Sequence, residues 1–383
     1  MNFHLSCRRF AFIALIAILA GSVSAQGSFM GLGNLPSGDQ SYGFGVSSDG
    51  HTVVGQGTSS PIITEGFRFS GGQMQGLGDL PGGPQISEAT SVNSNGSVIV
   101  GNSWSNSQGP EAFRWSASTG IVGLGFLPGG TQHSEATGVS GDGNTVAGFA
   151  IMPNGIYQGF RWTSGGGMQS IGDLSGGNQQ SVATNISSDG STLIGYSSGS
   201  NGIEAFRWFG GTMSGLGDLS GGDFYSAASG SSANGQVIVG NSKSTNGYEA
   251  FRWTSGTGMV GLGDLGGGTF DSTAIATNSD GSVIVGYGAS GGSTEAFYWT
   301  QSGGMRNLKE MLQSDYGLNL TGWNLNQAKA VSADGSTIVG WGINPSGKKE
   351  AWMAQVNPVP EPGTLLGIGL GAGMLLIVRR KRG

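Results

Sequence analysis

The sequence predicts an all-β fold built from repeated units, and two regularities of the chain carry this prediction. The first is an Asp-Gly or Asn-Gly dipeptide that recurs at a nearly constant interval, beginning at residues 49, 95, 142, 189, 234, 280 and 334. The second is the pair of short β-forming runs that flanks each dipeptide, a strong hairpin signal for which a type I′ turn is expected. Self-similarity at such a period is typical of architectures in which each unit packs only against its neighbours.

Each repeat contains four candidate strands. They are exemplified by Ala136 to Ser140 before the dipeptide, Val98 to Gly101 after it, the motif Glu111 to Trp115, and a final Met/Val-x-Gly-Leu-Gly run. Four short strands in about 40–50 residues are the size of a propeller blade, so the sequence predicts a seven-bladed β-propeller of four-stranded blades. Side chains alternate along a strand, so Phe113 and Trp115 share one face and are expected to pack on the adjacent blade.

The phase of the repeats predicts how the ring closes. A fourth-strand motif, Met30 to Leu35, stands before the first repeat, whereas the seventh copy stops after its third strand, Glu350 to Ala354. An N-terminal strand that completes the last blade would remove an open sheet edge. We therefore expect one propeller domain at residues 29–356 in which the N-terminal strand closes the last blade.

The sixth copy departs from the others. Residues 305–323 replace the usual Gly-Leu-Gly-Asp-Leu run and account for the longer interval before the last dipeptide. Leu308, Met311 and Leu312 fall at helical spacing. The insertion is therefore expected to form one or two helical turns on the rim of the ring.

Composition narrows the class of protein. Glycine accounts for 77 of 383 residues, a bias that by itself suggests disorder, but the glycines recur in phase with Val, Ile, Phe and Trp and are assigned to turns. The net charge is −6, and six of the 17 basic residues lie in the terminal segments, so residues 26–359 hold 11 basic against 22 acidic side chains. Such an acidic surface repels phosphate backbones, which argues against nucleic-acid binding.

The N-terminus has the layout of a secretory signal peptide at residues 1–25. Arg8 and Arg9 precede an apolar run, and the small-residue pattern Val23-Ser24-Ala25 predicts cleavage after residue 25. The only cysteine, Cys7, lies in this segment and would leave with it. The mature chain is therefore expected to lack a thiol for a disulfide, a metal or a nucleophile.

Two recurring motifs carry a family resemblance across about residues 29–356. The Glu-Ala-Phe-Arg-Trp motif, as at Glu204 to Trp208, and the Gly-Leu-Gly-Asp-Leu motif, as at Gly215 to Leu219, resemble the bacterial HAF-type extracellular repeats. The resemblance implies a secreted protein whose biochemistry is unassigned. It carries over no catalytic residues.

The C-terminal segment, residues 357–383, resembles a PEP-CTERM sorting signal. It contains a Pro-Glu-Pro triplet, an apolar run from Gly363 to Val378 and a basic end, namely Pro360, Glu361, Pro362, Arg379, Arg380, Lys381 and Arg382. As a helix the apolar run would reach roughly 24 Å, enough for one C-terminal transmembrane helix with local bilayer thinning and a cytoplasmic basic end. The resemblance implies an exosortase-type membrane protease as partner, in Gram-negative bacteria that usually also make exopolysaccharide.

No catalytic, cofactor or metal site is expected. His51 and His133 occupy different places in their repeats, so neither a zinc site nor a Ser-His-Asp site is supported. The aspartates of the Gly-Leu-Gly-Asp-Leu motif could bind Ca²⁺, accept hydrogen bonds from turn amides or pair with the strand arginines, and a structural role is favoured. These two sets are Asp79, Asp173, Asp218 and Asp264, and Arg68, Arg114, Arg161, Arg207 and Arg252.

Aromatic residues near the variable loops are the candidate ligand-binding residues. The loops between second and third strands are expected on the same face as the connections between blades, and surface loops on a rigid scaffold commonly carry binding sites. The candidates there are Trp104, Phe149, Tyr157, Tyr196, Tyr248, Tyr287 and Trp341, with Phe224, Tyr225 and Phe270 from the connections. Aromatic faces beside Asn and Gln suit sugar rings, although any one of these residues could instead anchor its loop.

These observations favour an exported, non-enzymatic repeat protein of the cell surface or extracellular matrix, with an exopolysaccharide as candidate ligand. The alternative is a secreted carbohydrate-active hydrolase or lyase that uses carboxylates in the propeller channel. Glu88 and Glu135 could supply such a pair, although both stand at a repeat position without distinguishing context.

Overall fold

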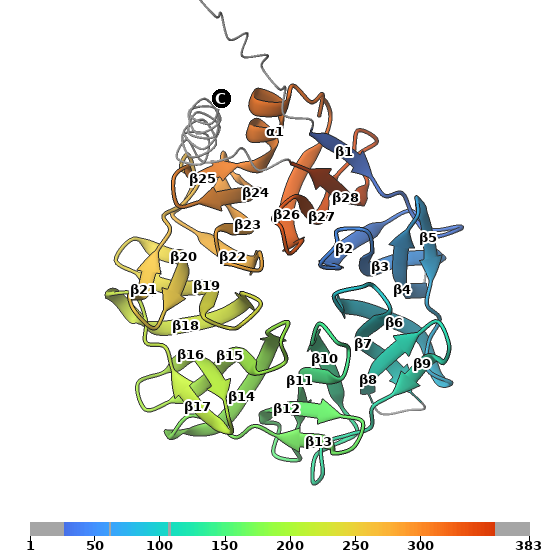
Figure 1. Ribbon diagram of the computed structural model, residues 1–383, viewed down its shortest axis with the longest axis vertical. Helices are drawn as coiled ribbons and strands as arrows, with labels where there is room; N and C mark the ends of the chain where they lie inside the picture. Colours follow the sequence, from blue (N-terminus) through green and yellow to red (C-terminus); the bar gives the residue numbers. More distant parts are fainter. Residues whose placement is uncertain (1–26, 61–62, 106–108, 357–383) are drawn as a thin grey trace, which may run out of the picture.

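The computed structural model describes residues 27–60, 63–105 and 109–356, which form a ring of β-sheets around a central opening (Figure 1). Within these ranges there are 28 strands and one helix, so the protein is all-β and propeller-like. The predicted signal peptide and the predicted transmembrane helix both lie outside the described residues. Among the described residues, no helix combines the length and the apolar character needed to cross a bilayer.

The described strands form antiparallel units of four. The first three units comprise β2 (Ser41–Val46), β3 (Val53–Ser60), β4 (Ile63–Ser70) and β5 (Gln73–Gly76); β6 (Gly82–Val92), β7 (Val98–Ser105), β8 (Gly109–Ser116) and β9 (Gly120–Gly123); and β10 (Ser134–Val139), β11 (Thr145–Ile151), β12 (Tyr157–Thr163) and β13 (Gly167–Ser170).

The fourth to sixth units comprise β14 (Gly176–Ile186), β15 (Thr192–Gly199), β16 (Ile203–Phe209) and β17 (Thr212–Gly215); β18 (Gly221–Ser231), β19 (Val237–Ser244), β20 (Gly247–Thr254) and β21 (Gly258–Gly261); and β22 (Ser272–Thr277), β23 (Val283–Ser290), β24 (Ser293–Thr300) and β25 (Gly304–Asn307). The seventh comprises β26 (Asn324–Val331), β27 (Thr337–Ile343), β28 (Lys349–Gln355) and β1 (Ser28–Gly31). Two pairs of units are joined into eight-stranded sheets, each by one parallel residue pair, Thr64 with Ile86 and Ile203 with Tyr225.

The last unit is completed by the strand from the other end of the domain. β1 pairs antiparallel with β28, with Ser28 opposite Gln355 and Gly31 opposite Trp352, in agreement with the predicted closure. The strand is shorter than the predicted motif, because Leu32 and Leu35 follow it as buried core residues instead of strand residues. Four of the other fourth strands, β5, β9, β17 and β21, likewise end at the glycine before the motif leucine, as β9 ends at Gly123.

The dipeptide turns close each first hairpin, but they are not type I′ turns. In the first unit the Gly50 amide donates to the Ser47 carbonyl, and the Ser47 amide donates to the Thr52 carbonyl. Gly50 has a φ of 74°, whereas Asp49 keeps a negative φ. The turn is therefore a wider four-residue loop in which the Asp49 carboxylate accepts from the Ser47 hydroxyl and the His51 amide, so the prediction of positive φ at both positions was wrong.

Seven backbone hydrogen bonds join these turns into a closed ring. The carbonyl of the residue before each dipeptide accepts a bond from the preceding unit, with N to O distances of 2.7–3.2 Å. The donor is the amide of the counterpart residue, except in the fourth unit, where it is the amide of Asp189. The donors and acceptors follow the chain and return to the start, namely Ser48 to Ser94, Ser94 to Gly141, Gly141 to Ser188, Asp189 to Ala233, Ala233 to Ser279, Ser279 to Ala333 and Ala333 to Ser48. The ring of sheets is therefore closed by backbone contacts as well as by β1.

A fully buried serine forms a second link between neighbouring units. In the third unit the Ser134 hydroxyl accepts from the Ala112 amide at 3.0 Å and donates to the Gly125 carbonyl at 2.8 Å, so one side chain satisfies two backbone groups of the preceding unit. The same pair of bonds recurs at Ser41, Ser87, Ser134, Ser181, Ser226 and Ser272. The Ser41 link bridges the seam, since it bonds to Gly33 and to Ala351 of β28.

The hydrophobic core is divided among the interfaces between units. Phe113 is fully buried in a cluster with Val54 and Leu77 of the preceding unit, which confirms that the motif phenylalanine packs on the adjacent unit. Trp115 is only partly buried at the edge of that cluster. The glycine of the Val-Ile-Val-Gly run is required because a Cβ at Gly101 would overlap the carbonyl oxygen of Glu88.

The predicted helical insertion forms α1 (Leu308–Tyr316) on the rim between the last two units, and it is slightly longer than the predicted one or two turns. Leu308, Met311 and Leu312 are buried in one cluster with residues of both units, as their spacing predicts. At this interface Asn326 stands where the linking serine stands elsewhere, and its amide donates to the Thr294 carbonyl instead. The helix thus provides apolar packing where the serine link is missing.

The seam yields a stability prediction. Deleting residues 28–32 removes the pairing partner of β28 and the buried Leu32, so we expect a loss of about 3–5 kcal/mol, the range found when a large buried side chain is lost. Urea unfolding and size-exclusion chromatography measure the effect, and deletion of five residues after Pro358 is the control. Unchanged stability and solubility of the N-terminal deletion would show that β1 is dispensable for closure.

Candidate functional site

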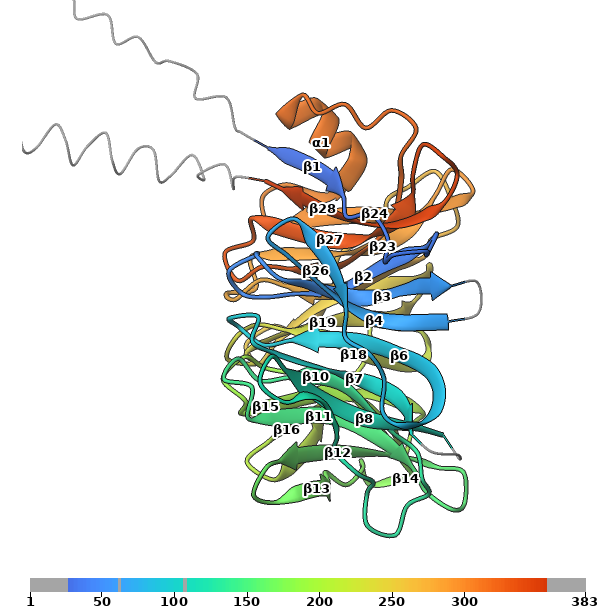
Figure 2. The same cartoon turned by 90° about the vertical axis from the view of Figure 1, so that its right-hand side faces the viewer.

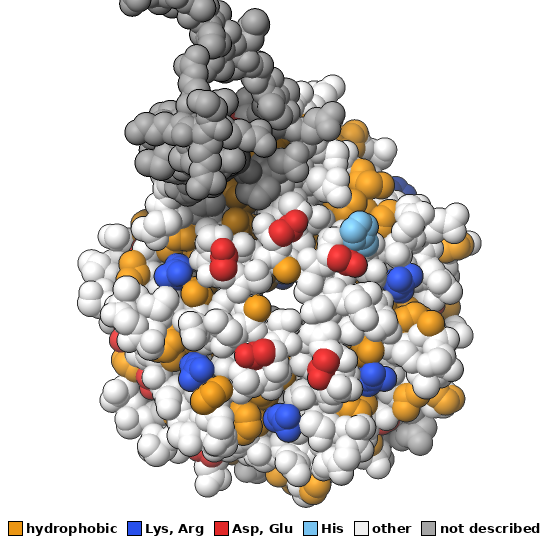
Figure 3. Space-filling model, viewed as in Figure 1, with side chains coloured by type: hydrophobic (Ala, Val, Ile, Leu, Met, Phe, Trp, Pro, Cys, Tyr) orange, Lys and Arg blue, Asp and Glu red, His pale blue; other side chains and the backbone are white. Residues whose placement is uncertain are grey.

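The ring has two unlike faces. We call the face that carries the dipeptide turns the turn face, and the face that carries the connections between units the connection face. On the turn face, acidic side chains surround the central opening and basic side chains lie farther out (Figure 3). The inner acids belong to the turns, where burial is slight and bonds from the turn lower their pKa, as at Asp142 with Ser140 and Asn144.

The strand arginines brace the turns of the next unit. The guanidinium groups of Arg114, Arg207 and Arg252 donate to the carbonyls of Gly143, Gly235 and Gly281, at 3.2–3.3 Å. Among the described residues no ion pair joins a strand arginine to Asp79, Asp173, Asp218 or Asp264. The proposed pairing of these two sets was therefore wrong, because the arginines point to the turn face.

In the Gly-Leu-Gly-Asp-Leu motif, the amide of the second glycine donates to a glutamate and not to the motif aspartate. Glutamates of the third strands accept from the second glycine at 2.9–3.0 Å, as Glu111 does from the Gly125 amide. The other pairs are Glu65 with Gly78, Glu204 with Gly217, Glu249 with Gly263 and, across the seam, Glu350 with Gly33. The carboxylate therefore organises the connection after the fourth strand. The sequence signal for this role was the glutamate that precedes Ala-Phe-Arg-Trp in several copies.

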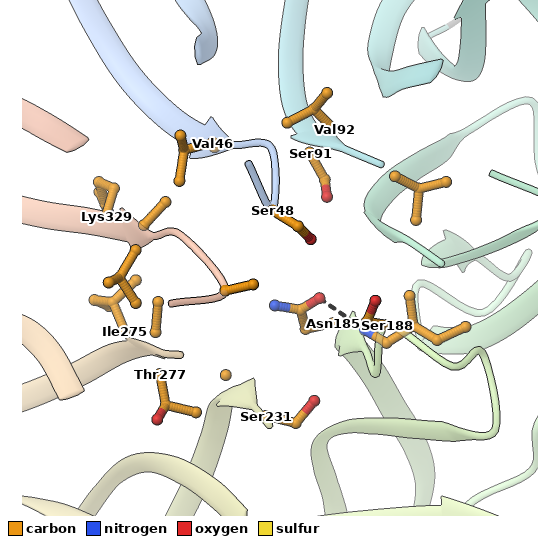
Figure 4. A pocket seen from close by; sticks show the side chains of 18 of the residues that line it. Val46, Ser48, Ser91, Val92, Asn185, Ser188, Ser231, Ile275, Thr277 and Lys329 are labelled. Atoms are coloured by element: carbon orange, nitrogen blue, oxygen red, sulfur yellow. Dashed lines mark hydrogen bonds between the residues drawn. The ribbon is translucent and has the colours of Figure 1, made fainter. Parts of the chain in front are cut away.

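A cavity of about 310 Å³ lies on the axis of the ring (Figure 4). Its lining consists mostly of small side chains from the first strands and the turns. At the turn end it narrows, since the Ser94 hydroxyl lies 3.0 Å from the Ser48 hydroxyl and 3.3 Å from the Ser188 hydroxyl. The larger lining side chains, Phe44, Ile275 and Lys329, stand one step farther from the turns, at the position that threonine or serine holds in the other units.

Three charged side chains gather where the cavity approaches the connection face. Burial raises the pKa of the Glu88 carboxyl and the negative charge of Glu135 raises it further, whereas Lys329 and a hydrogen bond from Asn102 oppose the shift. Burial lowers the pKa of the Lys329 amine, and Glu88 opposes that change. Glu135 also pairs with the His133 ring at 3.0 Å. The structure thus brings Glu88 and Glu135 into electrostatic contact.

Sequence reasoning missed Lys329. The sequence does distinguish Lys329, because it is the only charged residue at its position in the repeat. In the other units this position holds Phe44, Thr90, Thr137, Thr184, Ser229 or Ile275. Its neighbour Glu88 belongs to the second unit and Lys329 to the seventh. Only the closed ring brings the two into electrostatic contact.

Of the candidate aromatic residues only Phe270 lies in a loop, and the others lie on strands. They occupy the loop-proximal ends of second and third strands, with Trp104 on β7, Tyr157 on β12, Tyr196 on β15, Tyr248 on β20, Tyr287 on β23 and Trp341 on β27. The loop assignment was wrong because these strands extend farther toward the connection face than the sequence pattern indicated. Phe149 and Tyr225 lie on β11 and β18, so they too are strand residues.

Most of these aromatics form an arc along the connection face. Tyr157 contacts Phe149 with ring centroids 5.5 Å apart, and Tyr248 contacts Tyr225 at the same distance. Burial raises the pKa of Tyr196, and the nearby Tyr225 and Tyr157 raise it further, so Tyr196 lies between the two pairs. Tyr287 likewise adds to the effect of burial in raising the pKa of Tyr225. We define the aromatic arc as Phe149, Tyr157, Tyr196, Tyr225, Tyr248 and Tyr287.

The other candidates, among them Trp104 and Trp341, are not part of this arc. Trp341 packs on Tyr42 at 5.3 Å, and the Lys349 amine lies over both rings. Tyr42 was not among the candidates predicted from the sequence. It occupies the position in the first unit that Glu88 holds in the second, directly before a Gly-Phe pair. Trp104 makes no ring contact with another aromatic within the described ranges.

Comparison with known proteins identifies the C-terminal segment. Residues 358–382 match the PEP-CTERM protein-sorting motif. This motif marks an exported protein that an exosortase recognises, as the tail predicted. No curated protein sequence matches the chain.

Solved structures support the fold. Oligogalacturonate lyase from Vibrio parahaemolyticus is similar with a TM-score of 0.57 and 10% identity, over 88% of this chain and 98% of that one. The β-propeller domain of the Trilobed protease from Pyrococcus furiosus has a TM-score of 0.49 and 8% identity, over 85% of this chain and 100% of that one. TolB from Acinetobacter baumannii has a TM-score of 0.44 and 15% identity, over 70% of this chain, which spans only 62% of the TolB chain. At 10% identity, the likeness to the lyase shows the fold alone.

The raised pKa of Glu88 makes a prediction about pH. A carboxyl whose pKa is higher in the folded than in the unfolded protein stabilises the fold at low pH, and that contribution is lost as the pH rises through the folded value. Glu88→Gln removes this titration, so its stability relative to the parent should increase as the pH rises above the ordinary value of 4.5. Urea unfolding across this window measures the difference. Glu310→Gln on α1 controls for the loss of one carboxylate, and parallel pH profiles for parent and Glu88→Gln would contradict the assignment.

Proposed function

We propose that this chain is an exported, non-enzymatic seven-bladed β-propeller of the HAF-repeat type that binds exopolysaccharide through its connection face. The aromatic arc is the observation that carries the proposal. Its six rings come from four consecutive units, so they offer a row of contacts for a chain of sugar rings instead of a single pocket. Tyr157 and Tyr248 are 39% and 38% exposed, which leaves their faces available.

The seven-bladed interpretation is supported by the closed ring of seven turn-to-turn hydrogen bonds. Each bond joins one repeat to the next, and the last returns to Ser48 in the first repeat. A rigid ring of this kind holds the arc at fixed spacing, which reduces the conformational entropy lost when an extended ligand binds.

The polar surroundings of the arc also suit a sugar. The Lys243 amine lies over the Tyr248 ring and forms an ion pair with Asp223 at 2.7 Å. Aromatic rings bind the apolar faces of sugars, while charged and amide groups around them accept or donate hydrogen bonds to hydroxyls.

A hydrolase or lyase is the competing function, and the Glu88 site favours it. A raised pKa beside a second carboxylate is typical of general acid–base pairs in glycosidases. The similar lyase from Vibrio parahaemolyticus shows that this fold can host such chemistry. New reducing or unsaturated ends, released from polysaccharide by the parent but not by Glu88→Gln, would establish catalysis and displace the binding-module proposal.

Binding to the arc is tested with exopolysaccharide purified from the native host. Residues 26–358 should be retained on the immobilised polysaccharide, and Tyr196→Ala or Tyr248→Ala should weaken binding about tenfold, equivalent to ~1.4 kcal/mol. Phe209→Ala is the matched control, because Phe209 is an aromatic residue with 50% exposure at the opposite end of its unit. Equal retention of all three variants would show that the arc is not the binding surface.

The tail makes a separate prediction about maturation. We propose that the apolar run from Gly363 to Val378 anchors the precursor until the exosortase cuts near the Pro-Glu-Pro triplet. Proline disfavours helix in the residue before it, so the triplet should stay extended and accessible to the protease. Replacing all three residues by alanine should leave an uncut, membrane-retained form. Intact mass of the protein from the native host tests this, and a mature species that keeps residues 363–383 would show that the tail is a simple anchor.

A further inference from the structure

Both ends of the described domain leave the ring from the turn face. Ser28 at the start of β1 lies opposite Gln355 at the end of β28, and the Ser28 hydroxyl donates to the Gln355 side chain at 3.2 Å. The Val356 amide then donates to the Ser336 carbonyl at 2.7 Å. Ser336 directly follows the turn dipeptide of the seventh unit, so the chain exits beside that turn. Figure 2 shows β1 beginning and β28 ending on the same side of the ring.

The connection from the domain to the apolar run is short. Only residues 357–362 separate Val356 from Gly363. The seven residue-to-residue steps from Val356 to Gly363 span at most about 25 Å when fully extended. The turn face at Val356 must therefore stay within about 25 Å of the point where the apolar run begins.

The thickness of the ring decides which face can meet the membrane. β27 has seven residues, so a unit is about 23 Å thick along its strands before the loops are added. The loop of residues 344–348 and the turn at the other end make the unit thicker than its strands alone. A connection of at most about 25 Å that starts at the turn face therefore cannot pass around the full thickness of the ring. The connection face therefore cannot lie against the membrane while the tail is inserted.

We propose that the uncut precursor is held with its turn face toward the membrane and its connection face directed away from it. The inference rests on the proposed membrane tether of the tail. It places the aromatic arc and the open end of the cavity outward, where an extracellular polysaccharide is accessible before sorting. It also makes the turn face the side that the membrane surface covers, with the ring of turns and the bracing arginines as its contact surface.

The orientation can be measured by cysteine labelling in the full chain. Asn144 and Asn154 are exposed loop residues of the same unit, Asn144 on the turn face and Asn154 between β11 and β12 on the connection face. Each is replaced singly, as Asn144→Cys or Asn154→Cys, and the variants are produced in the native host. The same chain also carries Pro360→Ala, Glu361→Ala and Pro362→Ala, which prevent cutting. Spheroplasts are treated with a bulky, membrane-impermeant polyethylene glycol maleimide.

We expect Asn154→Cys to react at least about fivefold faster than Asn144→Cys on membranes, and the ratio to return to the value of the detergent-solubilised protein once the membrane is removed. Inserting 12 Gly and Ser residues after Asn357 should abolish the difference on membranes, because the longer connection frees the domain to rotate. A ratio that is the same on membranes and in detergent would overturn the orientation. Recovery of the uncut chain in the soluble fraction would instead refute the tether itself, and the orientation with it.

Discussion

Closure of the ring at its turns is the constraint on which the other features depend. Seven backbone hydrogen bonds join the turns of neighbouring units, and the last of them returns to the first repeat. These groups lie around the axis where strands converge, so any unit that shifted would leave a backbone donor and an acceptor unpaired in a confined space, at a cost of about 1–3 kcal/mol per group. The buried serines add a second set of links at six of the interfaces. The core is correspondingly distributed among the interfaces, and no unit has a core of its own.

The closed geometry also explains why so much of the chain is small and polar. The glycine after Val-Ile-Val, the serine links and the narrow turn end of the cavity leave little volume for larger side chains. Glu88, Lys329 and the aromatic arc replace the repeated residues at positions farther from the turns, toward the connection face.

The seam connects folding to export. β1 follows closely on the predicted signal peptide, and its partner β28 ends just before the sorting tail. A contact between residues more than 320 positions apart forms only when the last repeat is available, and contacts of such separation slow folding. The pairing of β1 with β28 therefore needs the whole domain to be available. Its two ends then lie together at the turn face.

The sequence by itself determined the repeat, the four strands of each unit, the closing strand and the helix, because each depends on local periodicity or on a motif that recurs. Leu308, Met311 and Leu312 are an example, since their spacing alone identified the face that is buried. The sequence did not determine the turn type, because the wider loop is stabilised by the Ser47 hydroxyl and the His51 backbone amide, which both bond to the Asp49 carboxylate. Nor did it show that glutamate, and not aspartate, holds the connection amides. The electrostatic coupling of Glu88 with Lys329 and the continuity of the aromatic arc were decided only by the tertiary structure, since they join residues of different units that approach one another when the ring is closed.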